Sequence, residues 1–480
     1  MLLFLLGMAI LLVGGYFYGR YCEKVFGPDD RPTPAQTMAD GIDYVEMDSK
    51  RNMLIELLNI AGTGPILGPI QGILFGPIAF ISIPIGCVLA GSLHDYFVGM
   101  ISMRNEGGQV PKLVNRYMGG TTNKVYNVVI WILMLLTGVV FIYTPGDLIV
   151  NDVMHMDVNS SVIWVVYGII FLYYIIATLF PIDKIIGKIY PIFGAILIVS
   201  AIGIFVGILF DGGANLHSMT GGFLMKHPGG QKFIPVFFIT VACGIMSGFH
   251  GSQATLISRT VGSEKDGRKV FYNMMIAEGF IAMCWAAGAM ILFNRGTALD
   301  TGATLMVGNI SREFMGKIGG YFAIVGVIVL PITSGDTAFR SLRLMVAEQF
   351  NIDQKVAKNR IVLSIVLFIP AMAILFFAKT NSAGFQILWR YFGFANQLVA
   401  VFALAMITVY LKVENKNYWI SLIPGLFYTF IVASYIFNAP IGLNLPLTIA
   451  YIIGIGFMVF FYYFTTNTAK RRRKIILQGK

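Results

Sequence analysis

The sequence predicts an all-α polytopic membrane protein, and three observations lead to this fold class. Apolar residues make up 56% of the 480 residues and charged residues only 12%, which is about half the charged fraction of a soluble domain. The mean hydropathy is +0.74. Stretches of about 18 or more apolar residues recur along the chain, each long enough to cross roughly 30 Å of hydrocarbon. Two of these stretches are interrupted in the middle and occupy matching positions in the two halves of the chain.

Thirteen membrane spans are predicted. The first, Leu2 to Tyr18, has no basic residue before it and no small-residue cleavage site, so we expect an anchor helix rather than a signal peptide. The third contains Pro84, which interrupts its helical pattern. The predicted limits are 2–18, 54–76, 77–101, 125–143, 162–180, 189–210, 233–255, 270–293, 319–339, 360–378, 386–411, 418–437 and 446–466.

Ten of these spans, from residue 54 to residue 411, form two sets of five, and each set begins with an interrupted span. Because five is odd, the two sets must have opposite orientations in the membrane. Inverted repeats with broken first helices describe a LeuT-like 5+5 core. The predicted regions are an anchor helix with a connector (1–53), a first repeat (54–210), a second repeat (233–411) and two C-terminal helices with a basic tail (412–480).

The distribution of basic residues predicts the orientation. Of the 35 Lys and Arg residues, 28 lie in the tail and in the loops 19–53, 102–124, 181–188, 256–269, 340–360 and 412–416. Basic residues accumulate in cytoplasmic loops, so we expect the N-terminus outside and the C-terminus inside, in the cytoplasmic (inner) membrane. The same distribution accounts for the net charge of +11 without a nucleic-acid partner. The basic run 470–474 is expected to contact anionic membrane lipid.

The two interruptions predict a binding site for a small anion. The first contains the run from Gly62 to Pro65, and the second spans 247–251. Lipid cannot satisfy the backbone groups that such breaks expose, so the breaks must line protein or a wet cavity. Each restarted half-helix points the positive end of its dipole toward the membrane centre, where free backbone N–H groups bind carboxylate or phosphate. The alternative is close helix packing, which we expect of Gly68, Gly72 and Gly76.

Side chains at the breaks are expected to complete this site. The Thr63 hydroxyl is expected to cap the outer half-helix, and Pro65 suits its first turn. Ser247 or Ser252 is expected to cap the inner half-helix, and His250 adds a donor or a titrating group. The residues predicted to bind substrate are Gly62, Thr63, Gly64, Ser247, His250, Gly251, Ser252 and Gln253.

The ninth span carries a candidate ion site at Asp336, with hydroxyls at Thr333, Ser334 and Thr337. Ionisable residues inside a span are costly and usually functional. Oxygen ligands beside unwound backbone carbonyls suit Na⁺, and the carboxylate alternatively accepts a proton. The coupling ion is therefore left open between Na⁺ and H⁺. A structural ion pair of Asp336 with Arg340, four residues on, is the alternative.

Other polar residues within spans are candidates for gating or proton relay. They are His94, Asp95, Arg340 and Asn396. For the neighbours His94 and Asp95, a helix-end network is an alternative. Glu278 is expected to pair with a basic group on a neighbouring helix.

The motifs of common enzyme classes do not occur. No glycine-rich phosphate loop ends in Gly-Lys-Ser or Gly-Lys-Thr, and no pair of histidines has metal-ligand spacing. We therefore predict no enzyme activity, no cofactor and no metal beyond a Na⁺ coupling ion. Four cysteines show no paired spacing and are expected in core packing rather than disulfides: Cys22, Cys87, Cys243 and Cys284.

Five motifs resemble those of the carbon starvation protein A (CstA) family. They are NIAGTGPILGP at 59–69, GSLHDY at 91–96, GIMSGFHGSQAT at 244–255, TSGDTAFR at 333–340 and RYFGFANQ at 390–397. The resemblance covers about residues 1–411. It implies an inner-membrane secondary transporter of the amino acid–polyamine–cation superfamily, in a family linked to uptake of peptides and pyruvate during nutrient limitation.

The resulting hypothesis is cation-coupled import of a small carboxylate-bearing nutrient, either a peptide, pyruvate or an amino acid, by alternating access. The substrate carboxylate would rest near Thr63 and Ser252, and Asp336 would bind or relay the cation. The alternatives are a channel and a nutrient sensor that binds without transport. An accessory membrane subunit and the oligomeric state are left open.

Overall fold

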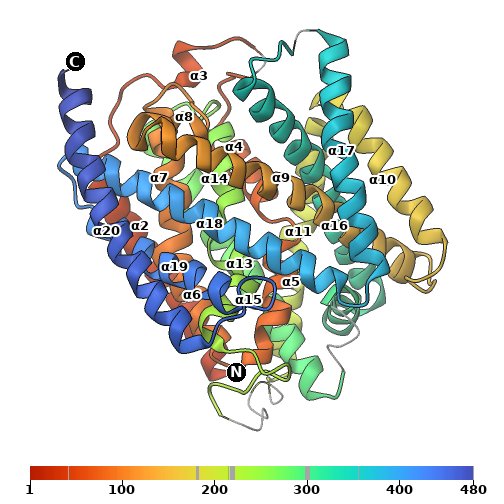
Figure 1. The fold of residues 1–480 in the computed structure, drawn as a ribbon. Helices are drawn as coiled ribbons and strands as arrows, with labels where there is room; N and C mark the ends of the chain where they lie inside the picture. The colour runs from red at the N-terminus through yellow and green to blue at the C-terminus, as the bar shows by residue number, and fades with distance from the viewer. Residues whose placement is uncertain are drawn as a thin grey trace.

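The computed structural model describes residues 1–41, 43–179, 183–213, 216, 222–297, 303–354 and 356–478 as a bundle of helices (Figure 1). Within these residues, regular structure is helical apart from one isolated β-bridge that joins Met47 to Val261. Part of the predicted basic loop 181–188 lies outside the described residues, as do Lys355 and Lys480.

The N-terminal half is built from eleven α-helices within the described residues. They are α1 (Leu2–Ala9), α2 (Gly15–Phe26), α3 (Pro34–Thr37), α4 (Ser49–Ile60), α5 (Gly64–Gly72), α6 (Ala79–Gly86), α7 (Ser92–Met103), α8 (Val110–Met118), α9 (Gly120–Leu148), α10 (Val162–Leu179) and α11 (Asp183–Phe210). Short π-helical turns join α1 to α2 and α6 to α7, so each of these pairs forms one continuous apolar span.

The C-terminal half follows the same plan, with short helices first and long helices after them. Its helices are α12 (Phe233–Thr240), α13 (Ala242–Ile245), α14 (Gly248–Ile257), α15 (Asn273–Asn294), α16 (Ala303–Gln349), α17 (Ala357–Thr380), α18 (Gly384–Val413), α19 (Trp419–Asn438) and α20 (Leu447–Gln478). The most apolar windows of the α15 and α18 spans are 83% buried and that of α20 only 17%, which places α15 and α18 in the core and α20 at the edge.

Ten helices among the described residues are long and apolar enough to cross a membrane, and the bent pair formed by α4 and Gly64–Phe75 brings the number to eleven. The other two predicted spans are a shorter apolar helix, Val162–Ala177, and a segment divided among α12, α13 and α14. Every predicted span therefore has helix at its position, but length and composition do not establish the predicted total of thirteen.

The two interrupted segments run antiparallel and pack directly on each other. A Cβ atom on Gly64 would lie 2.1 Å from the Cβ of Cys243, and one on Gly68 would lie 2.9 Å from the carbonyl oxygen of Thr240. From Gly64 to Gly68 the residue number rises along the first segment, whereas from Cys243 to Thr240 it falls along the second, as antiparallel packing requires. The packing role predicted for Gly68 is confirmed, and it extends to Gly64.

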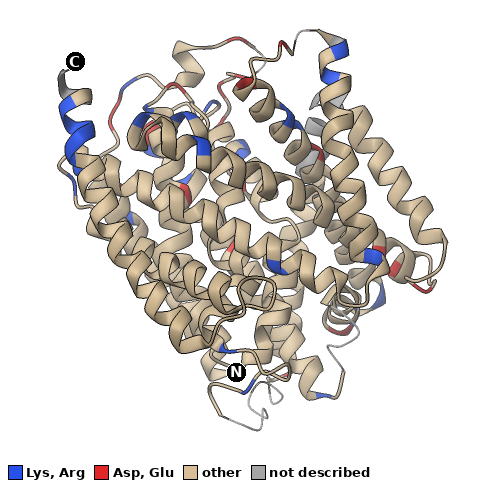
Figure 2. Cartoon of the chain, in the orientation of Figure 1, with Lys and Arg blue, Asp and Glu red and all other residues tan. Residues whose placement is uncertain are grey.

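Lys and Arg gather at the end of the bundle that carries the C-terminus, beside α3 and α8 (Figure 2). We call this end the C-terminal face. The concentration of positive charge there agrees with the sequence count, and the orientation of this face toward the cytoplasm stays a prediction.

Candidate functional site

The first break lies where the chain passes from α4 to α5. α4 ends at Ile60, and α5 starts at Gly64 with its axis turned by 50°. Thr63 occupies the N-cap position, and Pro65 lies in the first turn, as predicted. The expected hydroxyl cap is wrong, because the buried Thr63 Oγ1 has no hydrogen-bond partner among the described residues. This hydroxyl is therefore available to a ligand.

The second break is shorter than the sequence indicates. Only Met246 and Ser247 have extended backbone between α13 and α14. The predicted interruption over 247–251 is wrong beyond Ser247, because Gly248 to Gly251 form the first turn of α14. His250 therefore lies on a regular helix, in the first turn after the break.

The cap of α14 comes from another helix, α18. The Asn396 side-chain oxygen accepts hydrogen bonds from the Ser247 hydroxyl at 2.7 Å and from the Phe249 backbone N–H at 3.2 Å. The expectation that Ser247 or Ser252 caps α14 is wrong: Ser247 makes no side-chain cap bond, and Ser252 lies within α14. Asn396 and Gln397 were also expected to hydrogen-bond either substrate or another helix, and the bond to another helix is found, whereas the capping role of Asn396 was not predicted.

The neighbouring amide of Gln397 completes the same junction. Its Nε2 donates to the carbonyl oxygens of Phe238 at 3.3 Å and Met246 at 3.2 Å. Both carbonyls belong to the segment divided among α12, α13 and α14, where the regular hydrogen bonds of a continuous helix are interrupted. A pair of adjacent amides on α18 thus satisfies polar backbone groups that lipid would leave unpaired.

The two breaks meet under an aromatic cover from α9. A Cβ atom on Gly62 would lie 2.9 Å from Cζ of Phe141, and the ring of Phe141 meets the ring of Phe249 edge-on with centroids 6.1 Å apart. Both rings are buried. The meeting point of the breaks is therefore closed from solvent in this conformation.

Directly beside the breaks, four helices bring five buried titratable side chains together. They are Glu56 on α4, His94 and Asp95 on α7, His250 on α14 and Glu278 on α15, each no more than 1% exposed. Glu56 is near enough to Asp95 and Glu278 for their charges to act on one another. His94 Nδ1 lies 2.7 Å from Asp95 Oδ1. His250 Nδ1 lies 3.4 Å from Asp95 Oδ2 and 3.5 Å from Glu278 Oε2. We call this set the acid–histidine cluster.

The acid–histidine cluster brings together residues for which the sequence predicted separate roles. His94 with Asp95 and His250 were candidates for different roles, and the expected basic partner of Glu278 proves to be His250. Glu56 was missed, although a glutamate inside a predicted span is itself a signal of function. Among the described residues, no group of three or more His, Cys, Asp or Glu side chains has an arrangement that could hold a metal ion.

Asp336 lies on α16, away from any break in the helix. Its carboxylate accepts hydrogen bonds from Tyr173 at 2.7 Å and Thr337 at 2.9 Å. The Thr333 hydroxyl donates to carbonyl oxygens in the preceding turn, and the guanidinium of Arg340 donates to the carbonyl of Ala177. The expectation of unwound backbone is wrong, because α16 stays helical through residues 331–337.

Two further charged groups form a buried pair that the sequence analysis did not single out. Lys379, at the end of α17, lies 2.8 Å from Asp147 on α9, and Tyr167 donates to the same carboxylate oxygen at 2.8 Å. Lys379 also lies over the ring of Tyr143. The pair links α9 to α17, and neither of these helices is one of the two broken segments.

At the C-terminal face, the connector is tied to the loop after α14. The Arg104 guanidinium makes two hydrogen bonds of 2.9 Å to the buried Glu264 carboxylate, and the Asp29 backbone N–H donates to the same carboxylate at 3.1 Å. Hydrogen bonds from Arg31 hold the pKa of Asp29 well below its usual range. A lowered carboxyl pKa stabilises the folded chain at neutral pH, and this contribution is lost only at strongly acidic pH. We call Asp29, Arg31, Arg104 and Glu264 the connector clamp.

Removing Arg104 should release the connector. Arg104→Ala leaves the Glu264 carboxylate buried without its main partner, and breaking a buried pair in this way costs about 3–5 kcal/mol. Hydrogen exchange measured by mass spectrometry should rise in peptides covering 27–41 and 260–268. Lys112→Ala is the control, since its pair with Glu106 is exposed and worth little. Unchanged exchange in Arg104→Ala would contradict a role for the clamp.

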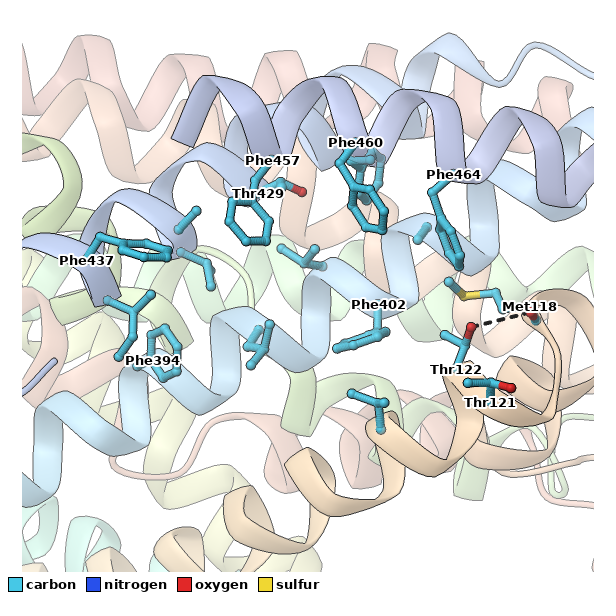
Figure 3. Close-up of a pocket in the computed structure, with 18 residues that line it drawn as sticks. Met118, Thr121, Thr122, Phe394, Phe402, Thr429, Phe437, Phe457, Phe460 and Phe464 are labelled. Carbon is cyan, nitrogen blue, oxygen red and sulfur yellow. Dashed lines mark hydrogen bonds between the residues drawn. The ribbon is translucent and has the colours of Figure 1, made fainter. Parts of the chain in front are cut away.

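A large apolar cavity of about 450 Å³ lies elsewhere, between α9, α18, α19 and α20. Its lining is formed by aliphatic and phenylalanine side chains with three threonines (Figure 3). The hydroxyl of Thr122, in the first turn of α9, donates to the carbonyl oxygen of Met118 at the end of α8. A cavity of this composition does not suit a carboxylate, so it is separate from the candidate site at the breaks.

These features define a multi-pass helical membrane protein in which two broken, antiparallel helices meet in the interior beside buried charges. Broken helices that meet at mid-membrane are a feature of many transporter folds. The sequence pattern of the family "Carbon starvation protein CstA" matches three overlapping segments, 1–169, 139–309 and 293–435. The chain therefore belongs to the CstA family.

Individual relatives agree with this assignment. The peptide transporter CstA of Escherichia coli is 24% identical over 87% of this chain and 78% of its own length. An uncharacterized membrane protein of Haemophilus influenzae is 38% identical over 62% of this chain and 93% of its own length. Among solved structures, a manganese transporter of Eremococcus coleocola, in complex with an aromatic bis-isothiourea compound, has a TM-score of 0.59 at 14% identity. The match covers 91% of this chain and 99% of the manganese transporter chain. This likeness establishes a common fold alone.

Proposed function

We propose that this protein is a secondary active transporter that imports a small carboxylate-bearing nutrient by cation-coupled alternating access. The observation that carries the proposal is the meeting of the two breaks, where α5 and α14 both begin. Helix N-termini at membrane depth favour an anionic group. Peptides, pyruvate and amino acids all carry one, and the E. coli relative is named a peptide transporter.

The substrate site in this proposal includes the unpartnered Thr63 hydroxyl on one side and the first turn of α14 on the other. In the closed conformation, the Asn396 amide oxygen already accepts the Phe249 N–H. A substrate carboxylate would take over this N–H when α18 moves away from α14. Gln253, whose Nε2 is buried without a partner among the described residues, is placed to add specificity from α14.

The proposal includes the 5+5 inverted-repeat core and the orientation predicted by the basic residues, with the N-terminus outside and the C-terminus in the cytoplasm. Antiparallel packing of the two broken segments supports an inverted relation between the repeats. The gathering of Lys and Arg at the C-terminal face supports the orientation.

Uptake into proteoliposomes tests the proposed function. Purified protein should accumulate radiolabelled pyruvate, alanine or dialanine when an inward Na⁺ or H⁺ gradient is imposed, because a coupled transporter concentrates its substrate. Protein-free liposomes are the control. Accumulation of none of these substrates under either gradient would contradict the assignment, and large unitary currents would indicate a channel instead.

Asp336 is proposed to bind or relay the coupling cation together with Thr333, Ser334 and Thr337. Asp336→Asn removes the charge and keeps one acceptor oxygen, for either Tyr173 or Thr337, while the other hydroxyl can accept from the new amide NH2 group. The variant should therefore fold and lose gradient-driven accumulation. Glu313→Gln is the matched control, because that carboxylate is 46% exposed at the surface, where it pairs with Arg295. Wild-type accumulation by Asp336→Asn would rule out the proposed role.

A further inference from the structure

The acid–histidine cluster carries more acid than its surroundings neutralise. Its three carboxylates come from three different helices and are fully buried. Both oxygens of Glu56 and both of Glu278 have no hydrogen-bond donor among the described residues. Among the residues that the structure describes, no lysine or arginine forms an ion pair with any of these three carboxylates.

The other titratable groups facing the cluster do not supply positive charge. Cys87, in the turn before α7, and Cys243 of α13 are near enough to Glu278 for its charge to act on their thiols. Thiols are neutral or negative, so only the two histidines can compensate the carboxylates. With both imidazoles protonated, three ionised carboxylates still leave one net negative charge in a site that excludes water. Burial favours the uncharged carboxyl group, so the cluster must retain protons in the closed conformation.

The geometry also provides a route between carboxylates. His250 Nδ1 lies at nearly equal distances from Asp95 Oδ2 and Glu278 Oε2, 3.4 and 3.5 Å. A proton leaving the Glu278 carboxyl can bind this nitrogen and then pass to Asp95. Glu278 becomes a carboxylate, His250 returns to its neutral form, and Asp95 becomes the carboxylic acid.

The cluster is attached to the moving parts of the proposed transporter. Glu56 lies one turn before the end of α4 at Ile60, and His250 lies in the first turn of α14. Each broken helix thus contributes one member, while α7 and α15 contribute the others. A rearrangement at the breaks would change both the separation of these groups and their access to water.

We propose that the acid–histidine cluster is a proton-binding site, in which Glu278 and Asp95 exchange a proton through His250 and Glu56 adds a further acid group, and that release of this proton to one side drives transport. The driving role rests on the proposed transport function, whereas proton retention by the cluster does not. This site is separate from Asp336 and would make H⁺ the coupling ion.

Infrared spectroscopy tests proton retention without any substrate. A protonated carboxyl group has a C=O stretching band that an ionised carboxylate lacks. Wild-type protein in detergent at neutral pH should show this band, and Glu278→Gln or Glu56→Gln should lose part of it. Glu313→Gln is the control, because that carboxylate is 46% exposed and pairs with Arg295, so it should contribute no such band. No band in the wild type, or an unchanged band in both glutamine variants, would overturn the proposal.

Transport measurements test the driving role. In proteoliposomes loaded with pyruvate or dialanine, Glu278→Gln should abolish accumulation driven by an inward proton gradient but retain exchange of labelled for unlabelled substrate. Full proton-driven accumulation by a protein that carries both Glu278→Gln and Glu56→Gln would overturn the proposal. If the wild type transports neither compound, the proposed function fails for these substrates, and the infrared result still decides whether the cluster holds protons.

Discussion

Gly64→Ala is expected to impair transport strongly and to destabilise the protein. An added Cβ atom would lie 2.1 Å from the Cβ of Cys243 and 2.8 Å from its Sγ, which is well inside van der Waals contact. Overpacking of this kind costs about 1–3 kcal/mol, and more where backbone must move. Here the displaced backbone belongs to both breaks, so uptake should fall by at least about tenfold, the effect of roughly 1.4 kcal/mol. Proteoliposome uptake and thermal unfolding measure the two effects.

A second substitution tests whether the steric clash with Cys243 causes the loss of stability and uptake. Gly64→Ala combined with Cys243→Gly moves the side-chain carbon from one helix to the other, so part of the lost stability and uptake should return. Full recovery is not expected, because glycine inside a helix costs about 1 kcal/mol. Gly168→Ala on α10 is the matched control, since a Cβ there meets nothing within 4 Å. A Gly64→Ala variant that resembles Gly168→Ala would show that the broken helices do not need this close contact.

The existence of both breaks could be predicted because the signals are local. Gly62, Gly64 and Pro65 are poor residues for the middle of a helix, and Pro65 fits the first turn of α5, where it is found. The apolar spans were predictable for the same reason, since length and hydropathy are read directly from the chain. Helix is found at every predicted span among the described residues.

The partners of the breaks could not be predicted, because they depend on contacts between distant residues. Asn396 caps α14 from 149 residues away, and a sequence without aligned relatives offers no signal for that pairing. Local reasoning therefore assigned the cap to the nearest hydroxyl residues. Glu56 carried a local signal, as a glutamate inside a predicted span, but its neighbours in the cluster become apparent only when α4, α7, α14 and α15 pack together.

The unwound backbone expected beside Asp336 shows the opposite error. Pro331, Gly335 and several hydroxyl residues lie close together and are typical of an interrupted helix. In the folded protein the Thr333 hydroxyl bonds to carbonyls of the preceding turn, as expected of a threonine within a helix. A tyrosine oxygen of α10 lies where a side chain on Gly335 would go. This glycine therefore allows close helix packing rather than unwinding.

Asn396→Ala should lower the stability of the protein by about 2–6 kcal/mol. The substitution removes the acceptor of the Ser247 hydroxyl and the Phe249 N–H, and each buried donor left unsatisfied costs about 1–3 kcal/mol. Thermal unfolding of the purified protein measures the loss. Asn381→Ala is the matched control: this exposed asparagine also accepts a backbone N–H, that of Ala383, but water can replace it. Equal stability of the two variants would contradict the capping role.

Asn396→Asp then tests whether the start of α14 is an anion site. Aspartate keeps an acceptor for both donors and places a negative charge at the helix N-terminus, which the helix dipole favours. Stability should therefore exceed that of Asn396→Ala, although burial of the charge and loss of the Nδ2 hydrogen bond to the Phe392 carbonyl at 3.2 Å keep it below that of the wild type. The resident carboxylate would occupy the N–H groups assigned to the substrate and would repel its negative charge, so uptake of pyruvate or dialanine should be lost. Wild-type uptake by a stable Asn396→Asp protein would show that the substrate carboxylate binds elsewhere.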